Sequence, residues 1–333
     1  MTDLNTHWLG LALRSPVVIG ASPLSDDLDS LRACVEAGAG AVVMHSLFEE
    51  QLIAEQMAAH RFIDSRINSD AEALSFFPES QMTSAGSRAY LKRLELLRAS
   101  LEVPVIASLN GVSAGGWLDH ASELEQAGAS ALELNLYDPA AVGGESAAQL
   151  EGRQLEVVAG VVERVAIPVT VKLSPFYSAL PALVAAIDDA GAAGVAVFNR
   201  FYQPDIDLDE LALRRDIVLS TSAELPQRLH AIAQLHGHTR LELAATGGVH
   251  SGDDAVKAIL CGAAVVQVVS AVLARGPLAV AEILDGLATR LAAMGYLSVH
   301  QARGALSLLN APDPHTWERL NYARLLQGWR PRN

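Results

Sequence analysis

Cysteine is scarce in this sequence, which has only Cys34 and Cys261 among its 333 residues. Each lies in a segment with helical periodicity, so we expect two reduced core thiols and no disulfide framework. Neither Cys-x-x-Cys nor His-x-x-x-His occurs. We therefore expect no metal site and no iron–sulfur cluster.

Long apolar runs and an excess of basic residues are also missing. No apolar segment is long enough to cross a bilayer, and Met1–Asn5 has neither the basic nor the apolar region of a signal peptide. Acidic residues outnumber basic ones by 38 to 24, a net charge of −14 that repels nucleic acid and anionic membranes. We expect a cytoplasmic protein that binds a small molecule, with no nucleic-acid or membrane partner.

Half of the residues are hydrophobic, and many of them fall in short runs with the composition of strands buried on both faces. The eight predicted strands are Pro16–Ser22, Ala41–Ser46, Pro104–Asn110, Ala131–Leu136, Val169–Pro175, Gly194–Asn199, Leu241–Gly248 and Ala264–Val272. Predicted helices separate or follow them at Leu28–Ala37, Tyr90–Ser100, Ser122–Ala127, Glu151–Val165, Leu180–Ala190, Glu224–Leu235, Asp253–Cys261 and Leu278–Met294.

This strict alternation predicts an α/β protein, a closed (β/α)8 TIM barrel formed by one domain over residues 1–333. Four predicted helices end in Ala-Gly or Cys-Gly, where glycine permits the left-handed turn before the next strand. We expect Asn5–Arg14 to form a hairpin that plugs the barrel bottom, and the tail after Leu297 to form a C-terminal helical extension with Trp317 and Trp329. Insertions near 47–85, 137–150 and 200–223 follow strands, on the face where barrel active sites form.

A phosphate site is predicted where strands seven and eight end. Gly247 and Gly248 close strand seven, a helix begins near Ser251, and Ser270 closes strand eight. Barrels bind phosphate with these two loops and a helix N-terminus, because glycine lets backbone N–H groups approach the oxygens. A Gly-Gly pair can also form only a tight turn between a strand and a helix. Here the pair lies at the end of one of the two strands where barrels bind phosphate, which favours a phosphate site.

Lys172 lies in the predicted fifth strand, where an unpaired charge would be costly. It must therefore face either a bound anion or polar ring, or a barrel acid such as Glu133. Polar residues also end several other strands: Ser22, Ser46, Ser108, Asn135 and Asn199. Either asparagine alone is more often a cap or turn residue than a ligand contact, but a ring of polar groups around one lysine suits the binding of a flat heterocycle.

These motifs, in this order, resemble the dihydroorotate dehydrogenase family along nearly the whole chain. The likeness is carried by Trp8–Val17 (WLGLALRSPV), Glu133–Leu136 (ELNL), Val171–Pro175 (VKLSP) and the stretch from Thr246 to Pro277. The resemblance implies an FMN-dependent oxidoreductase of pyrimidine biosynthesis that acts on CH–CH groups, and it suggests a homodimer. It implies FMN contacts at Ala21, Ser22, Ser46, Ser108, Asn135, Lys172, Asn199, Gly247, Gly248 and Ser270.

Several substrate positions depart from the family pattern. Asp138 stands where the family has the Cys or Ser that removes the substrate proton, with Tyr137 before it and Ala140 in place of an orotate-binding asparagine. His45 replaces a lysine at the end of strand two. Asp138, Lys172 and His45 are thus the candidate catalytic residues.

The role of Asp138 stays open, because Asp-Pro is also a frequent helix start. A free aspartate, with a pKa of about 3.9, is a weak base unless burial or a nearby acid raises that pKa; Tyr137 or His45 are the alternative proton carriers. Two other functions remain: a flavin-binding paralogue without dihydroorotate activity, and a barrel lyase that grips phosphate and uses Lys172.

Overall fold

The computed structural model of the chain describes residues 2–48, 86–110, 114–137, 144–200, 205–214, 218–311 and 322–328. Eight parallel strands close into a barrel, with the last strand beside the first. In chain order they are β3 (Val17–Ile19), β4 (Ala41–Phe48), β5 (Val105–Asn110), β6 (Ala131–Asn135), β7 (Val169–Leu173), β8 (Gly194–Val197), β11 (Glu242–Thr246) and β12 (Val265–Val268). The predicted TIM barrel is confirmed.

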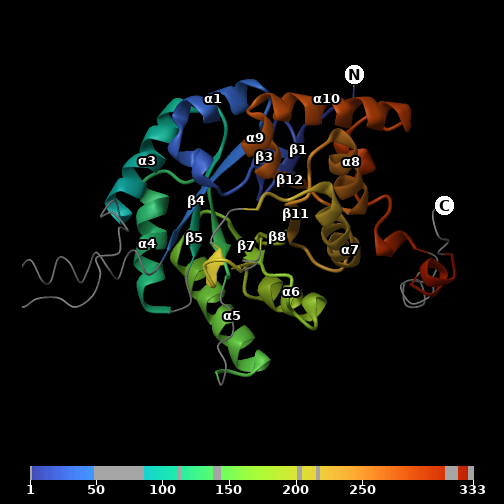
Figure 1. Cartoon of the computed structure of the whole chain (residues 1–333). Helices are drawn as coiled ribbons and strands as arrows, with labels where there is room; N and C mark the ends of the chain where they lie inside the picture. The colour runs from blue at the N-terminus through green and yellow to red at the C-terminus, as the bar shows by residue number, and fades with distance from the viewer. Residues whose placement is uncertain are drawn as a thin grey trace, which may run out of the picture.

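Helices surround the strands (Figure 1). They are α1 (Leu28–Glu36), α3 (Ser87–Ser100), α4 (Ala114–Gln126), α5 (Ala147–Arg164), α6 (Leu180–Asp189), α7 (Leu225–Leu235), α8 (Gly252–Cys261), α9 (Ser270–Arg275) and α10 (Leu278–Ala293). The glycines after α1, α4, α6 and α8 all have positive φ, between 87° at Gly191 and 126° at Gly262. They permit the tight turn into the next strand, as predicted.

Several predicted boundaries were wrong, and two of them have a clear physical reason. Helix α4 begins at Ala114, well before the predicted Ser122, because Gly115 and Gly116 weaken the helical signal of its first turns. The predicted strand Ala264–Val272 is a strand only to Val268, and α9 begins at Ser270. The first residues of α9 are also buried, so a continuous apolar run does not mark the change from strand to helix.

The N-terminal hairpin closes the amino end of the barrel, as predicted. Strands β1 (Thr6–Trp8) and β2 (Leu11–Leu13) pair antiparallel. The Thr6 hydroxyl donates to the Ala264 carbonyl at 3.2 Å, and the Leu9 amide donates to the Glu242 carboxylate. A Cβ on Gly194 would lie 2.8 Å from the Leu9 side chain, so this floor is closely packed. The open end of the barrel is therefore the opposite one.

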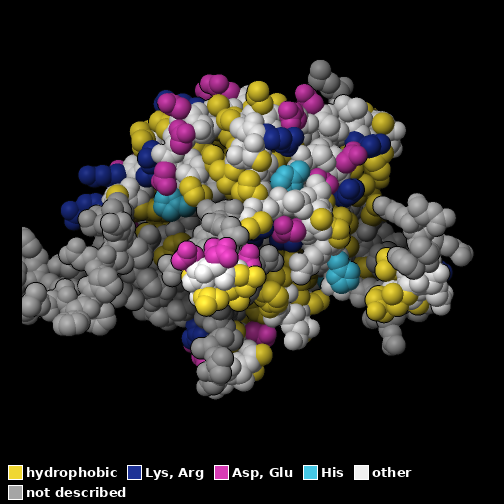
Figure 2. Space-filling view, viewed as in Figure 1, with side chains coloured by type: hydrophobic (Ala, Val, Ile, Leu, Met, Phe, Trp, Pro, Cys, Tyr) yellow, Lys and Arg dark blue, Asp and Glu magenta, His cyan; other side chains and the backbone are white. Residues whose placement is uncertain are grey.

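Smaller elements lie outside the barrel. Strands β9 (Asp205–Asp207) and β10 (Ala212–Arg214) form a hairpin after β8, which Figure 2 shows as a knob of acidic and apolar side chains at the centre of the view. Helix α11 (Val299–Ala302) and the 3-10 turns η1 (Pro23–Asp26), η2 (Ser222–Glu224) and η3 (Leu308–Asn310) complete the description. Trp317 and Trp329 of the predicted tail lie outside the described residues.

Both cysteines are free, and burial raises the pKa of each thiol to about 11. They are therefore protonated and unreactive near neutral pH. Across the described ranges, the helices all fall short of the length and apolar character that a membrane crossing requires. The same residues contain no group of three potential metal-ligating side chains.

Candidate functional site

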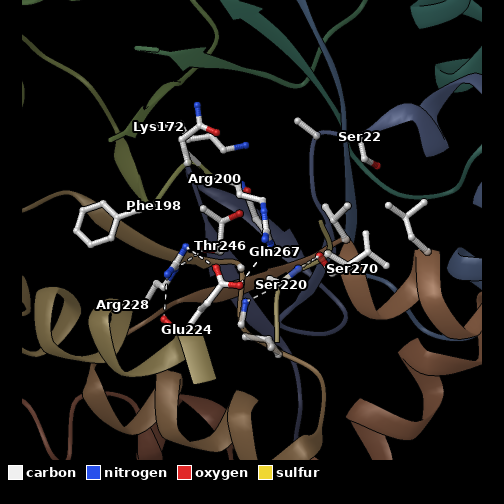
Figure 3. A pocket seen from close by; sticks show the side chains of 18 of the residues that line it. Ser22, Lys172, Phe198, Arg200, Ser220, Glu224, Arg228, Thr246, Gln267 and Ser270 are labelled. Carbon is white, nitrogen blue, oxygen red and sulfur yellow. Dashed lines mark hydrogen bonds and ion pairs between the residues drawn. The ribbon is translucent and has the colours of Figure 1, made fainter. Parts of the chain in front are cut away.

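A cavity of about 310 Å³ lies at the carboxyl ends of the strands, opposite the hairpin floor. Figure 3 shows Lys172 on one side of it and Arg228 with Glu224 on another. Of the residues that the family resemblance implies for FMN, those that line the cavity are Ala21, Ser22, Lys172, Asn199, Gly247, Gly248 and Ser270.

The predicted phosphate end brings β11, α9 and the segment before η2 together. Gly247 and Gly248 have φ of 84° and 81°, and a Cβ on Gly248 would lie 2.7 Å from the backbone nitrogen of Leu225. The Gly248 amide donates to the Ser220 hydroxyl at 3.3 Å, and the Ser220 amide donates to the Ser270 hydroxyl at 3.0 Å. Glycine is therefore required here by conformation and by space.

Sequence reasoning missed a buried arginine at this end. Arg228 of α7 is only 5% exposed, and its Nε donates to the Thr246 carbonyl at 3.1 Å. Burial lowers the pKa of its guanidinium, while the nearby Glu224 carboxylate opposes that shift. One feature of the sequence could have predicted this buried arginine. Arg228 lies three residues after Leu225 and four before Ile232, and is therefore on the apolar face of the predicted helix.

Glu224 lies between two arginines at the cavity wall. Its carboxylate oxygens are 3.5 Å from Arg200 Nη1 and 3.9 Å from Arg228 Nη2. Neither distance is a close hydrogen bond. These two arginines and one carboxylate leave a net positive charge at the phosphate end, in a chain whose total charge is −14.

The structure pairs Lys172 with Glu133, the barrel acid that the sequence analysis gave as one of two possible partners. Its Nζ lies 3.2 Å from Glu133 Oε1, and Gln267 Nε2 donates to Glu133 Oε2 at 2.7 Å. Glu133 is fully buried, whereas Lys172 and Gln267 also line the cavity. The three side chains form a polar cluster that joins β6, β7 and β12.

Three buried polar atoms of the lining residues have no hydrogen-bond partner among the described residues. They are the Ser22 hydroxyl, Gln267 Oε1 and Arg200 Nη1, and the last of these has only the ion pair with Glu224. A buried polar atom without a hydrogen bond costs about 1–3 kcal/mol, so its presence in a cavity wall indicates a polar ligand.

The remaining predicted polar residues form one hydrogen-bonded chain. Asn199 Nδ2 donates to Asn135 Oδ1 at 2.6 Å, Asn135 Nδ2 donates to Ser46 Oγ at 3.4 Å, and the hydroxyls of Ser46 and Ser108 are 2.8 Å apart. Of these four, only Asn199 lines the cavity. Asn135 holds the Asn199 amide directly, and Ser46 and Ser108 continue the hydrogen-bonded chain from Asn135.

The structure places the other two catalytic candidates differently. His45 Nδ1 lies 2.8 Å from the Ser25 hydroxyl and 3.5 Å from the Asp26 carboxylate, and its ring meets the edge of Tyr90. His45 does not line the cavity. Asp138 lies outside the described residues, as do residues 49–85 of the predicted insertion after strand two.

Comparison with known proteins decides the family. The sequence profile of the family described as dihydroorotate dehydrogenase matches residues 74–291. This chain belongs to the dihydroorotate dehydrogenase family. A putative dihydroorotate dehydrogenase A (fumarate) of Aeropyrum pernix is 34% identical over 227 residues, which are 67% of this chain and 74% of that protein.

Other relatives extend over more of the chain. The catalytic subunit of dihydroorotate dehydrogenase B (NAD(+)) of Methanosarcina acetivorans is 30% identical over 300 residues, covering 89% of this chain and 93% of its own. The corresponding protein of Pyrococcus abyssi is 28% identical over 309 residues, 90% and 98% of the two chains. The predicted family is confirmed, and with it the predicted class of FMN-dependent oxidoreductase.

Proposed function

We propose that this protein binds FMN in the cavity and oxidises a CH–CH bond of a small substrate, dihydroorotate or a related compound. One observation carries the proposal: a glycine cradle and a hydroxyl lie at one end of a cavity that has a fixed lysine elsewhere in its wall. A nucleotide with a phosphate tail and a flat polar ring matches both features.

The residues present fit FMN. Gly247, Gly248 and Ser270, which line the cavity, would hold the phosphate, since two glycines at positive φ leave room for the ligand to approach the backbone. The unpartnered atoms of Ser22 and Gln267 offer hydrogen bonds to the ring or its ribityl chain. When bound, FMN would supply the acceptor for a hydride from the substrate.

The substrate proton needs a base close to the carboxyl end of β6. We propose Asp138 for this role, because it directly follows Tyr137 and is three residues after Asn135, the last residue of β6. Asn199 would orient the substrate, since its side chain is held by Asn135. His45 is a weaker candidate, since Ser25 and Asp26 already engage its ring.

Replacement of the family's base and of its orotate-binding asparagine favours a second candidate, a flavoprotein that does not oxidise dihydroorotate. The test is the absorbance spectrum of the purified protein, then anaerobic addition of dihydroorotate. Bleaching of a flavin spectrum supports the first candidate, and a bound flavin that stays oxidised supports the second. A protein that neither carries FMN nor binds it when added contradicts both candidates. That result would favour the third possibility, a lyase that binds a phosphorylated substrate.

The base is tested separately. Asp138→Asn should keep the bound flavin and slow its reduction by the substrate at least about a hundredfold, the usual contribution of general base catalysis. Unchanged reduction by the variant would show that Asp138 is not the base. We also propose a cytoplasmic homodimer, which light scattering on the purified protein would test through its mass.

A further inference from the structure

The guanidinium of Arg228 is fixed by neutral acceptors. Its Nε donates to the Thr246 carbonyl at 3.1 Å, and its Nη1 donates to the Glu224 carbonyl at 2.9 Å. Both carbonyls hold the group in place without neutralising its charge. The side chain is more than nine-tenths buried, so water solvates that charge poorly.

The third nitrogen of Arg228 lies at the glycine cradle. Nη2 would be 3.2 Å from a Cβ built on Gly247, so the absence of a side chain there leaves room in front of the guanidinium. Glu224 Oε2 is 3.9 Å from Nη2, while the other oxygen of that carboxylate, Oε1, lies 3.5 Å from Arg200 Nη1. Glu224 is about one-third exposed, which further weakens its hold on the buried cation.

We propose that Arg228 is a direct ligand of the phosphate monoester of the flavin nucleotide, and that Glu224 is its weak counter-charge when no phosphate is bound. This inference rests on the proposed function. The Ser270 hydroxyl accepts from the Ser220 amide and can donate its own proton to the phosphate, and Arg228 adds a pre-oriented positive charge to this neutral donor. A phosphate dianion beside Glu224 would meet a like charge, so Glu224 tunes the affinity downward.

The comparison of FMN with riboflavin tests this directly, because the two differ only in the phosphate. The dissociation constant of each is measured by fluorescence quenching with cofactor-free protein. Arg228→Met should weaken FMN binding roughly tenfold or more and leave riboflavin binding nearly unchanged, as expected for a lost charged hydrogen bond. Glu224→Gln should shift the preference toward FMN, while Gln keeps an oxygen for the amide of Thr221.

Arg303→Met is the matched control. Arg303 is also partly buried and donates to a backbone carbonyl, that of Gly262 at 3.2 Å, but it does not line the cavity. Its replacement should leave the ratio of the two constants unchanged. Should Arg228→Met fail to fold, Glu224→Gln decides alone, because that side chain is partly exposed.

The outcomes separate two failures. Wild-type protein that binds neither flavin overturns the proposed function. Wild-type protein that binds both, with a ratio that neither Arg228→Met nor Glu224→Gln changes, overturns the assignment of Arg228 and leaves the flavin site in place.

Discussion

Glu133→Gln removes one negative charge from the polar cluster of Glu133, Lys172 and Gln267, with almost no change in side-chain volume. Lys172 Nζ then loses its partner at 3.2 Å, while Gln267 can still donate to the new amide oxygen. Breaking a buried ion pair from one side costs about 3–5 kcal/mol, because the other charge stays buried. The Lys172 side chain keeps 8% exposure at the cavity, so we expect the lower end, about 3 kcal/mol.

Urea unfolding of the cofactor-free protein measures this loss, since a bound flavin would add its own stabilisation. The surface variant Glu163→Gln is the control and should change the free energy of unfolding by less than about 0.5 kcal/mol. The double variant Glu133→Gln/Lys172→Met should recover part of the loss, because it leaves no unpaired charge. If the single variant is no less stable than the control, the ion pair does not stabilise this barrel.

Two further predictions concern the phosphate end. Gly248→Ala should lower the melting temperature more than Gly276→Ala in thermal unfolding. Both positions have φ near 80°, but only a Cβ on Gly248 would lie 2.7 Å from Leu225 N. Burial alone would raise the pKa of Asp254, yet hydrogen bonds from Ser222 and other donors lower it overall. A lowered folded-state pKa stabilises the protein above the unfolded value of about 3.9, so Asp254→Asn should cost most stability near neutral pH. That cost should shrink as the pH falls below the unfolded value; equal costs at pH 3 and pH 7 would contradict the shift.

The barrel could be predicted because its signals are local. A parallel strand covered by helices is buried on both faces, so Val169–Leu173 has the composition of a core strand whatever its neighbours. Glycine after a helix is equally local, as at Gly262. The predicted boundary between a strand and a helix was wrong where both elements have an apolar composition, as between β12 and α9.

The site was only partly predictable, for a physical reason. Lys172 lies on β7 and Gly247 directly follows β11, and because parallel strands end on the same face of the barrel, position along the chain predicts where both residues lie. Arg228 and Glu224 lie on α7 and just before it, and only the packing of that helix against β11 brings them to the cavity. The partnership of Gln267 with Glu133 likewise depends on closure of the barrel.

The arrangement of β6 explains how the family's scaffold and altered substrate positions coexist in one chain. Glu133 and Asn135 point into polar networks that tie β6 to its neighbours. The Leu136 amide still donates to the Lys172 carbonyl at 3.1 Å, and the Tyr137 amide donates back to the Asn135 carbonyl at 2.9 Å. Around β6, the positions that differ from the family pattern therefore begin after the last residue of the strand, Asn135. Under the proposed function, substitutions after Asn135 would change the substrate contacts and keep the hydrogen bonds of Glu133 and Asn135, so flavin binding and substrate choice could vary separately.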